Sequence, residues 1–274
     1  MSFIVGLDIG SALSKAVIMQ DGTLLSSGIS PSEGNFLSAI NSVLQEALGK
    51  TKLAMSDIDL IGACGLGASF IPHSFHKISE ILCQSRGTSY LLPTVRTLIE
   101  IGNQSSRIIK ITRQGKVADS LVSDKCAAGS GRILQIVAKV LKVDLKDMGQ
   151  LSLKSTQPVK FTTGCAVFLE TEAISRVAEG ASKENIIAGL HQALTARIAA
   201  MAHRMGLEED CVITGGGAEN SGLVKIMEEK LGKTLLVPDN PLITGAIGAA
   251  LIVTEKKVNL KKEENHAIET GCHC

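Results

Sequence analysis

The 274-residue sequence has no tryptophan, one tyrosine and an aromatic content of only 3%. Because aromatic rings are the platforms on which unpaired bases stack, this scarcity argues against a protein that binds single-stranded nucleic acid. An excess of positive charge is missing too, since 28 Lys and Arg residues face 27 Asp and Glu residues. A nucleic-acid surface needs a basic patch, so we expect no nucleic-acid partner.

Long hydrophobic runs are also absent. No apolar stretch reaches the roughly 20 residues that a membrane-spanning helix needs, so we expect no membrane partner. The sequence opens with an expected strand, Phe3–Leu7, and not with the basic segment and cleavage site of a signal peptide. Its seven cysteines are an odd number, which argues against a disulfide scaffold. We expect a reducing cytoplasm, with cysteines that are buried or bound to metal.

The phosphate-binding pattern Gly-x-x-x-x-Gly-Lys-[Ser/Thr] is missing as well, which excludes a P-loop. What is present is a well-packed composition, with 45% hydrophobic residues over a length that favours two domains. The pattern along the chain predicts an N-terminal subdomain over residues 1–95, a second subdomain over 96–255 and a mobile tail over 256–274.

Two stretches 92 residues apart share one pattern, in which a buried strand carries an acidic residue and then turns on a glycine before a basic residue. The corresponding residues are Asp8 and Glu100, Gly10 and Gly102, and Lys15 and Arg107. Each copy continues into a second strand and a further turn, at Asp21-Gly22 and Gln114-Gly115. An acidic residue and a glycine after a strand are common in α/β proteins, but two copies in register indicate an internal duplication. Two such halves can face each other across a cleft.

These turns have the chemistry of a nucleotide site. Backbone N–H groups after Gly10 and Gly102 can hold phosphate oxygens, and Asp8 can hold Mg²⁺ directly or through water. Gln104 could orient an attacking water. A third glycine turn, Gly215–Gly217, lies between an expected strand and a helix, where a ligand can approach the backbone closely. The alternative is that this triple glycine is only a tight turn.

Two cysteines, Cys126 and Cys165, each stand in a glycine-rich turn before an apolar-periodic segment. We therefore expect each at the N-terminus of a helix, where a thiolate is stabilised and is reactive or ready to bind metal. Cys64 and Cys83 are expected to be buried apolar cysteines. The Cys272-His273-Cys274 ending is not expected to hold metal, because a tail has no surrounding shell to fix the ligands.

The remaining pattern predicts helices over Phe36–Leu48 and Glu184–Met205 and a helix rich in small residues over Leu242–Val253. His191 and His203 of the long helix are expected to be exposed or packed and not catalytic.

The first hairpin, its second copy and the late glycine turn resemble the actin, hexokinase and Hsp70 ATPase superfamily. Two more specific segments are Asp124–Arg132 and Thr163–Glu170, whose cysteines stand 39 positions apart. They resemble the activators of 2-hydroxyacyl-CoA dehydratases and the ATPase subunits of benzoyl-CoA reductases, which form the BadF-BadG-BcrA-BcrD ATPase family. The resemblance covers nearly the whole chain except the tail. It implies an α/β fold of two duplicated actin/hexokinase-like (ribonuclease H-like) domains around a nucleotide cleft.

The resemblance also implies a function, which is ATP-dependent donation of a low-potential electron by an oxygen-sensitive homodimer. One [4Fe–4S] cluster per dimer would be held at the interface by Cys126 and Cys165 of each copy. ATP or ADP and Mg²⁺ are the other cofactors, with Asp8, Glu100 and Gln104 as catalytic residues. The implied nucleotide contacts are Gly10, Ser11, Ala12, Lys15, Gly102, Asn103, Gly129, Gly215, Gly216, Gly217 and Asn220. The implied partners are an upstream ferredoxin or flavodoxin and an electron-accepting iron–sulfur protein, either a 2-hydroxyacyl-CoA dehydratase or a double-cubane cluster protein.

The second phosphate motif departs from the family pattern Asp-x-Gly-Gly-Gln-Asp-x-Lys, because Glu100, Asn103, Ser105 and Arg107 replace an Asp, a Gly, an Asp and a Lys. These departures favour nucleotide binding over fast hydrolysis. Two alternatives stay open at this point: a small-molecule kinase of the same superfamily, and a nucleotide sensor without redox chemistry. A kinase needs a catalytic base, and no Asp after the second phosphate motif suggests itself for that role.

Overall fold

The structure is a computed structural model that describes residues 2–123, 127–162 and 165–269, with side chains up to residue 256. The chain divides into two compact units. Unit 1 comprises Met1–Leu91 and Ile243–Cys274, and unit 2 comprises Leu92–Leu242.

Unit 1 is built on a five-stranded sheet with the strand order β3-β2-β1-β4-β5. The strands are β1 (Phe3–Ile9), β2 (Leu13–Gln20), β3 (Thr23–Pro31), β4 (Leu60–Cys64) and β5 (His76–Lys77). The first three form an antiparallel meander, and β4 lies parallel to β1. Asp21 and Gly22 both have positive φ, 48° and 86°, as a tight hairpin turn requires. The predicted hairpin is therefore confirmed.

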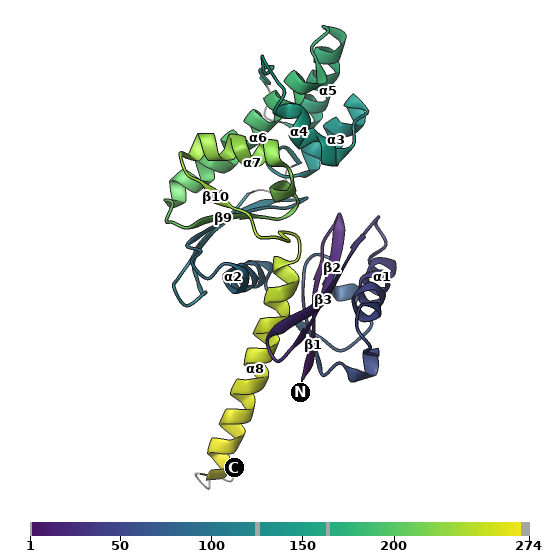
Figure 1. Cartoon of the computed structure of the whole chain (residues 1–274), viewed down its shortest axis with the longest axis vertical. Coiled ribbons are helices and arrows are strands. Elements are labelled where there is room, and N and C mark those ends of the chain that lie inside the picture. Colours follow the sequence, from purple (N-terminus) through teal and green to yellow (C-terminus); the bar gives the residue numbers. More distant parts are fainter. Residues whose placement is uncertain (1, 124–126, 163–164, 270–274) are drawn as a thin grey trace. The chain divides into compact units, whose positions relative to one another are not determined.

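Helices cover the two faces of this sheet (Figure 1). Helix α1 (Phe36–Gly49) starts at Asn35, whose side chain accepts a hydrogen bond from the Ser38 N–H, and buries Ile40 and Val43 against β2 and β3. Helices α2 (Glu80–Leu91) and α8 (Thr244–Glu269) pack together, and α8 also lies against β1 and β4. Short 3₁₀ turns at Met55–Asp57 and Ala68–Phe70 flank β4.

Helix α8 belongs to unit 1, whereas the sequence assigns residues up to 255 to the second subdomain. The reason is that the backbone of α8 packs closely against glycines of β1 and α2. A Cβ on Gly6 of β1 would stand 2.0 Å from the Ala246 carbonyl oxygen, and one on Gly87 of α2 would stand 1.8 Å from that of Thr244. Such approaches are open only to residues without a Cβ. The small residues of α8 therefore pack on a sheet some 240 positions earlier in the chain, which no local pattern reveals.

The sequence also predicts a separate tail from residue 256, whereas α8 continues through Lys256 to Glu269. Lys and Glu are good helix formers, so this charged stretch extends a helix that is already nucleated on the sheet. The cysteine-containing end of the predicted tail, residues 270–274, lies outside the described residues.

Unit 2 repeats the topology of unit 1, with the strand order β10-β9-β6-β7-β8. Its strands are β6 (Thr97–Ile101), β7 (Ser106–Ile111), β8 (Val117–Val122), β9 (Cys211–Thr214) and β10 (Leu235–Leu236). As in unit 1, the first three form an antiparallel meander and the fourth lies parallel to the first. The duplication inferred from the sequence is thus present in the fold.

The helices of unit 2 follow β8 and β9. They are α3 (Arg132–Leu141), α4 (Met148–Ser152), α5 (Ala166–Ala178), α6 (Lys183–Met205) and α7 (Ser221–Leu231), with 3₁₀ turns at Ala127–Gly129, Leu145–Asp147 and Gly216–Glu219. Helix α6 is the long amphipathic helix that the sequence predicts, and Ile187, Leu190 and Leu194 on it are buried in the core of the unit. Sequence periodicity locates α6 because this helix buries an apolar stripe.

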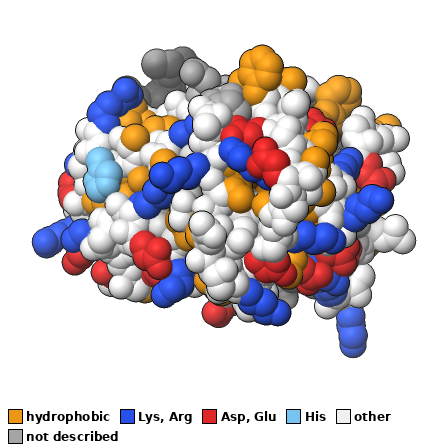
Figure 2. Space-filling view, turned by 90° about the horizontal axis from the view of Figure 1, so that it is seen from above, with side chains coloured by type: hydrophobic (Ala, Val, Ile, Leu, Met, Phe, Trp, Pro, Cys, Tyr) orange, Lys and Arg blue, Asp and Glu red, His pale blue; other side chains and the backbone are white. Residues whose placement is uncertain are grey.

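The surface carries mixed charge. On the face in Figure 2, Lys and Arg side chains alternate with Asp and Glu, and hydrophobic side chains are exposed among them. This agrees with the near-neutral composition. In the described part of the chain, no helix combines the length and the apolar character that crossing a membrane would need.

Candidate nucleotide site and cysteine segment

The first acidic residue of the duplicated pattern lies on β1, directly opposite the basic residue on β2. Asp8 pairs in register with Lys15, and the Lys15 Nζ lies 3.1 Å from Asp8 Oδ2. Both side chains are largely buried, so the pair is poorly screened by solvent. The intervening turn is closed by Gly10, whose N–H donates to the Leu13 carbonyl oxygen at 3.1 Å. Ser11 and Ala12 form the tip of this turn, as the sequence predicts.

The Asp8 carboxylate is also close to the start of α8. A Cβ on Gly245 would stand 2.9 Å from Asp8 Oδ2 and 3.1 Å from Gln84 Nε2. The Gln84 amide is itself oriented by Thr244, whose hydroxyl donates to Gln84 Oε1 at 2.6 Å. The first turn of a helix favours negative charge, which suits a carboxylate at this place. The sequence indicated neither Gln84 nor Gly245, because they approach Asp8 only through the packing of α2 and α8.

The second copy reproduces this arrangement in unit 2. Glu100 on β6 pairs in register with Arg107 on β7, and Arg107 Nη1 lies 2.6 Å from Glu100 Oε2. Gly102 closes the turn by donating to the Ser105 carbonyl oxygen at 3.0 Å, as Gly10 does in the first copy. Gln104, at the tip, is exposed. Asp8 and Glu100 therefore occupy equivalent positions in separate units.

Each unit carries a second glycine turn beside its acidic residue. The turns are Gly65–Ala68 and Gly215–Ala218, with the common pattern Gly-x-Gly-Ala. Each turn directly follows the last residue of a strand that runs parallel to the strand with the acid. In unit 1 this last residue is Cys64, which pairs with Asp8, and in unit 2 it is Thr214, which pairs with Glu100. The sequence predicts only the second of these turns. The first could have been found from the Gly-x-Gly-Ala repeat, which is a weak signal without the sheet register.

The opening glycine of each turn is required by its conformation. Gly65 has a φ of +93° and Gly215 a φ of +78°, which side-chain-bearing residues rarely adopt. A Cβ on Gly65 would stand 2.5 Å from the Ile9 carbonyl oxygen, and one on Gly215 would stand 2.6 Å from the Ile101 carbonyl oxygen. In unit 2 a Cβ on Gly215 would also lie 3.2 Å from Glu100 Oε1. Glu100 thus lies against both glycine turns of its unit.

The predicted nucleotide residues Gly216, Gly217 and Asn220 lie on and just after this turn. A Cβ on Gly216 would meet nothing within 4 Å, so the backbone there is open, whereas Gly217 packs on the Ile101 side chain. Asn220 is buried, and its side-chain oxygen caps α7 by accepting from the Leu223 N–H at 2.9 Å. Asn220 is therefore the N-cap of α7, a role that the sequence analysis did not predict.

The segment after Cys126 is hydrogen-bonded to the second of the two predicted phosphate turns. The Gly131 N–H donates to the Gly102 carbonyl oxygen at 2.8 Å, and the Ser130 hydroxyl donates to the Asn103 carbonyl oxygen at 2.9 Å. The Ser106 hydroxyl donates to the Gly129 carbonyl oxygen at 2.8 Å. We call these three hydrogen bonds the turn latch. Gly131 is the N-cap of α3, so the latch joins the turn to the beginning of that helix.

Cys165 is the N-cap of α5 and is exposed, which confirms its predicted place at a helix N-terminus. The helix that follows is unusual. Its apolar residues Val167, Phe168 and Ile174 are 68%, 63% and 52% exposed, while Ala166, Leu169 and Ala173 face the core. The apolar periodicity seen in the sequence therefore marks an exposed stripe. Cys126, with residues 124–125 and 163–164, lies outside the described residues.

The other described cysteines are buried. Cys64 and Cys83 are 2% and 0% exposed, as expected, and Cys211 is 1% exposed. A hydrogen bond with Cys83, together with burial, raises the pKa of the Cys64 thiol, and burial raises the pKa of Cys211. A raised pKa keeps a thiol protonated, which is unfavourable for a metal ligand. Among the described residues, no three His, Cys, Asp or Glu side chains cluster as a metal site would require.

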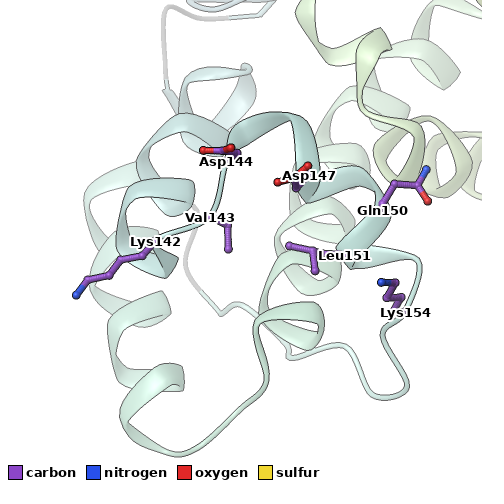
Figure 3. A pocket seen from close by; sticks show the side chains of 7 residues that line it. All are labelled: Lys142, Val143, Asp144, Asp147, Gln150, Leu151 and Lys154. Carbon is purple, nitrogen blue, oxygen red and sulfur yellow. The ribbon is translucent and has the colours of Figure 1, made fainter.

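A surface pocket of about 560 Å³ lies beside α3 and α4 in unit 2. Its lining residues are Lys142, Val143, Asp144, Asp147, Gln150, Leu151 and Lys154. Their charged side chains point in different directions and do not converge on one point (Figure 3). None belongs to the predicted nucleotide set, so we assign no ligand to this pocket.

Comparison with known proteins identifies the family of this chain. The chain matches the BadF/BadG/BcrA/BcrD ATPase family over residues 5–253. It is 37% identical to the 2-hydroxyisocaproyl-CoA dehydratase activator of Clostridioides difficile over 95% of this chain and 98% of the relative. It is 38% identical to the activator of lactoyl-CoA dehydratase of Anaerotignum propionicum over 92% of this chain and 98% of the relative.

Solved structures agree. The activator of the 2-hydroxyisocaproyl-CoA dehydratase from Clostridium difficile, with bound ADPNP, superposes with a TM-score of 0.90 at 37% identity, covering 95% of this chain and 97% of the other. A ROK family glucokinase from Streptomyces griseus, at 14% identity and a TM-score of 0.55 over 92% of this chain and 99% of the other, shares the fold. The predicted fold class of two duplicated actin/hexokinase-like α/β domains is confirmed. The chain belongs to the BadF/BadG/BcrA/BcrD ATPase family.

Proposed function

We propose that this protein is an ATP-dependent activator that donates a low-potential electron to a partner iron–sulfur enzyme. It would act as a homodimer that holds one [4Fe–4S] cluster through Cys126 and Cys165 of each copy. The observation that carries the proposal is the turn latch, because it joins the predicted phosphate turn of unit 2 to the segment that follows Cys126.

The nucleotide part of the proposal rests on the two acid–base hairpins. Each presents a glycine turn beside a carboxylate that is held by a basic side chain, Lys15 or Arg107. Backbone N–H groups of such turns bind phosphate oxygens, and a carboxylate suits Mg²⁺, directly or through water. Asp8 would take the Mg²⁺, Gln104 would orient the attacking water, and the open backbone at Gly216 would lie against the adenosine. The BadF/BadG/BcrA/BcrD relatives are ATPases by their family description, which supports this assignment.

Coupling between nucleotide and cysteine rests on the turn latch. A phosphate that binds the backbone of Gly102 and Asn103 would bind a turn whose carbonyl oxygens are held by Ser130 and Gly131. Ser130 stands four residues after Cys126, and Gly131 caps α3. A change in the turn on ATP binding or hydrolysis would therefore be transmitted to the start of α3 through the three hydrogen bonds of the turn latch.

The proposed [4Fe–4S] cluster rests on the position of Cys165 and on the exposed apolar residues that follow it on α5. A cubane needs four thiolates, and one chain offers two cysteines in glycine-rich turns, so a twofold partner would complete the set. Cys165 fits a cluster ligand because it is exposed at a helix N-terminus, where negative charge is favoured. The exposed stripe of Val167, Phe168 and Ile174 next to it fits an interface with a second copy. When bound, the cluster would supply a one-electron carrier of low potential.

The partner assignment comes from the relatives. Two of them are named as activators of dehydratases that act on CoA esters, and a third, from Thauera aromatica, is named as a component of benzoyl-CoA reductase. We therefore propose a 2-hydroxyacyl-CoA dehydratase or a double-cubane cluster protein as the electron acceptor, and a ferredoxin or flavodoxin as the donor. A cytoplasmic location is part of the same proposal.

The test is anaerobic purification and cluster reconstitution, followed by iron analysis and by visible and EPR spectra with and without ATP. We expect about four irons per dimer and an EPR signal that changes when ATP is added. A reconstituted sample that stays colourless would refute the cluster. ATP turnover stimulated by small polyols, in iron-free protein, would favour a kinase instead.

A further inference from the structure

The side chain of Asn220 is held by a second buried residue, which lies on α6. Asn220 Nδ2 lies 3.2 Å from Nε2 of His191, which sits in the middle of that helix and is 0% exposed. We propose that His191 is a positioning residue for nucleotide binding, which acts by fixing Asn220 at the end of the Gly215–Ala218 turn. This role rests on the proposed use of that turn for nucleotide.

The direction of the hydrogen bond follows from the cap. Asn220 Oδ1 accepts from the Leu223 N–H, so the other side-chain atom is the amide nitrogen, which can only donate. His191 Nε2 must therefore be the acceptor, and the ring proton must lie on Nδ1. The contact works only with a neutral imidazole in this tautomer.

The surroundings keep the imidazole in that form. His191 is enclosed in the core of unit 2, and desolvation lowers its pKa to about 3. At neutral pH the Nε2 lone pair is thus available to Asn220. Among the described residues Nδ1 has no hydrogen-bond partner, so the core bears the penalty of an unsatisfied N–H. An apolar side chain at this position would avoid that penalty, but it would leave the Asn220 amide without its acceptor.

The start of α7 is also held by contacts with α4. Gln150 Nε2 of α4 donates to the Ser221 hydroxyl at 3.0 Å. A Cβ on Gly149 would stand 3.0 Å from Asn220 Oδ1, so α4 lies directly against the cap. Asn220 directly follows the 3₁₀ turn Gly216–Glu219, and the Asn220 N–H donates to the Gly217 carbonyl oxygen at 3.2 Å. A shift of the Asn220 side chain would therefore move the backbone of the turn itself.

The first experiment determines the protonation state of His191 in the wild-type protein. ¹⁵N NMR of histidine-labelled protein at neutral pH should show His191 as a neutral ring protonated on Nδ1, with an acceptor shift on Nε2. His191→Gln identifies the resonance by its disappearance. A ring that is protonated on Nε2, or charged, would overturn the proposal whatever the nucleotide does.

The second experiment measures ATP binding by calorimetry in His191→Leu, His191→Gln and the control Leu194→Ala. We expect His191→Leu to weaken ATP binding about tenfold, because the Asn220 amide loses its acceptor. His191→Gln, which offers a carbonyl oxygen, should recover most of the affinity. Leu194→Ala removes a buried α6 side chain outside the hydrogen bonds of Asn220, so it should lower Tm but leave ATP affinity within about twofold of wild type.

The outcomes distinguish the role of His191 from the proposed function. Wild-type protein that binds no ATP would overturn the proposed function and this role with it. Wild-type binding that His191→Leu leaves unchanged would overturn only the role of His191. An equal loss of affinity in Leu194→Ala would show that the effect is general destabilisation, and would also refute positioning.

Discussion

Units 1 and 2 use the same sheet, the same acid–base hairpin and the same Gly-x-Gly-Ala turn, yet they differ in what surrounds the acidic residue. In unit 1 the acid is the shorter Asp8, its partner is the compact ammonium group of Lys15, and the start of α8 lies against it. In unit 2 the acid is Glu100, and its partner is the planar guanidinium of Arg107. Lys binds as a point charge, whereas Arg holds a carboxylate in a fixed geometry.

The second difference is what the turn is attached to. In unit 1 the hairpin turn is held by Ser32, whose hydroxyl donates to the Gly10 carbonyl oxygen at 2.7 Å. In unit 2 the equivalent turn is held by the turn latch, and so by the segment between Cys126 and α3. The duplicated sheet therefore repeats the acid–base hairpin, whereas in unit 2 the turn of that hairpin is also hydrogen-bonded to the residues that precede α3.

The largest expected effect concerns the cysteines. Cys165→Ala should abolish iron incorporation on reconstitution, because it removes two of the four thiolates of the dimer, while ATP binding persists. Cys211→Ala in the same unit is the matched control, and it should keep full iron content because its thiol is buried. Iron analysis decides between them. Iron lost in the control and kept in Cys165→Ala would reverse the ligand assignment.

The next comparison sets the two acids against each other. Asp8→Asn should reduce ATP hydrolysis about 100-fold, equivalent to about 2.7 kcal/mol of barrier, because the Mg²⁺ ligand loses its charge. Glu100→Gln should instead lower stability by about 3 kcal/mol, since it removes the negative charge that faces the largely buried guanidinium of Arg107. Phosphate release and urea unfolding measure the two effects. A larger loss of hydrolysis in Glu100→Gln than in Asp8→Asn would make the carboxylate of unit 2 the more important of the two predicted catalytic carboxylates.

A smaller effect tests the equivalence of the two glycine turns. A Cβ on Gly217 would stand 2.5 Å from the Ile101 Cβ, and one on Gly67 would stand 2.5 Å from the Ile9 Cγ2. Gly217→Ala and Gly67→Ala should each destabilise by about 1–3 kcal/mol in urea unfolding, as overpacking does. Gly216→Ala, which meets nothing within 4 Å, should stay within about 0.5 kcal/mol of wild type. Unequal losses at Gly67 and Gly217 would argue against equivalent turns.

The last expected effect is the acid sensitivity of unit 2, which appears only below neutral pH. The folded-state pKa of His191 is about 3, against an ordinary value of 6.5. The unfolded chain therefore takes up the proton first, and this contribution to stability is complete above pH 6.5 and is lost as the pH falls towards 3. At pH 5 the loss is about 2 kcal/mol. The difference in urea stability between wild type and His191→Gln should shrink by that amount between pH 7 and 5, and a constant difference would contradict it.

Several features could be inferred from the order of residues alone. The Asp8 and Glu100 hairpins were predictable because strand periodicity, turn glycines and the basic residue recur at a fixed spacing of 92 positions. The place of Cys165 before a helix and the burial of Cys64 and Cys83 were predictable for the same reason, since these are properties of neighbouring residues. Local patterns are enough where the physical cause is local.

Other features were decided by contacts between distant parts of the chain. Helix α8 joins unit 1 because glycines of β1 and α2 admit its backbone, and Val167 and Phe168 are exposed because Leu169 and Ala173 already fill the core-facing side of α5. The hydrogen bond between His191 and Asn220 joins residues 29 positions apart. A hydrogen bond or a close packing contact is set by three-dimensional distance, and spacing along the chain does not encode that distance until the sheet and helices have formed.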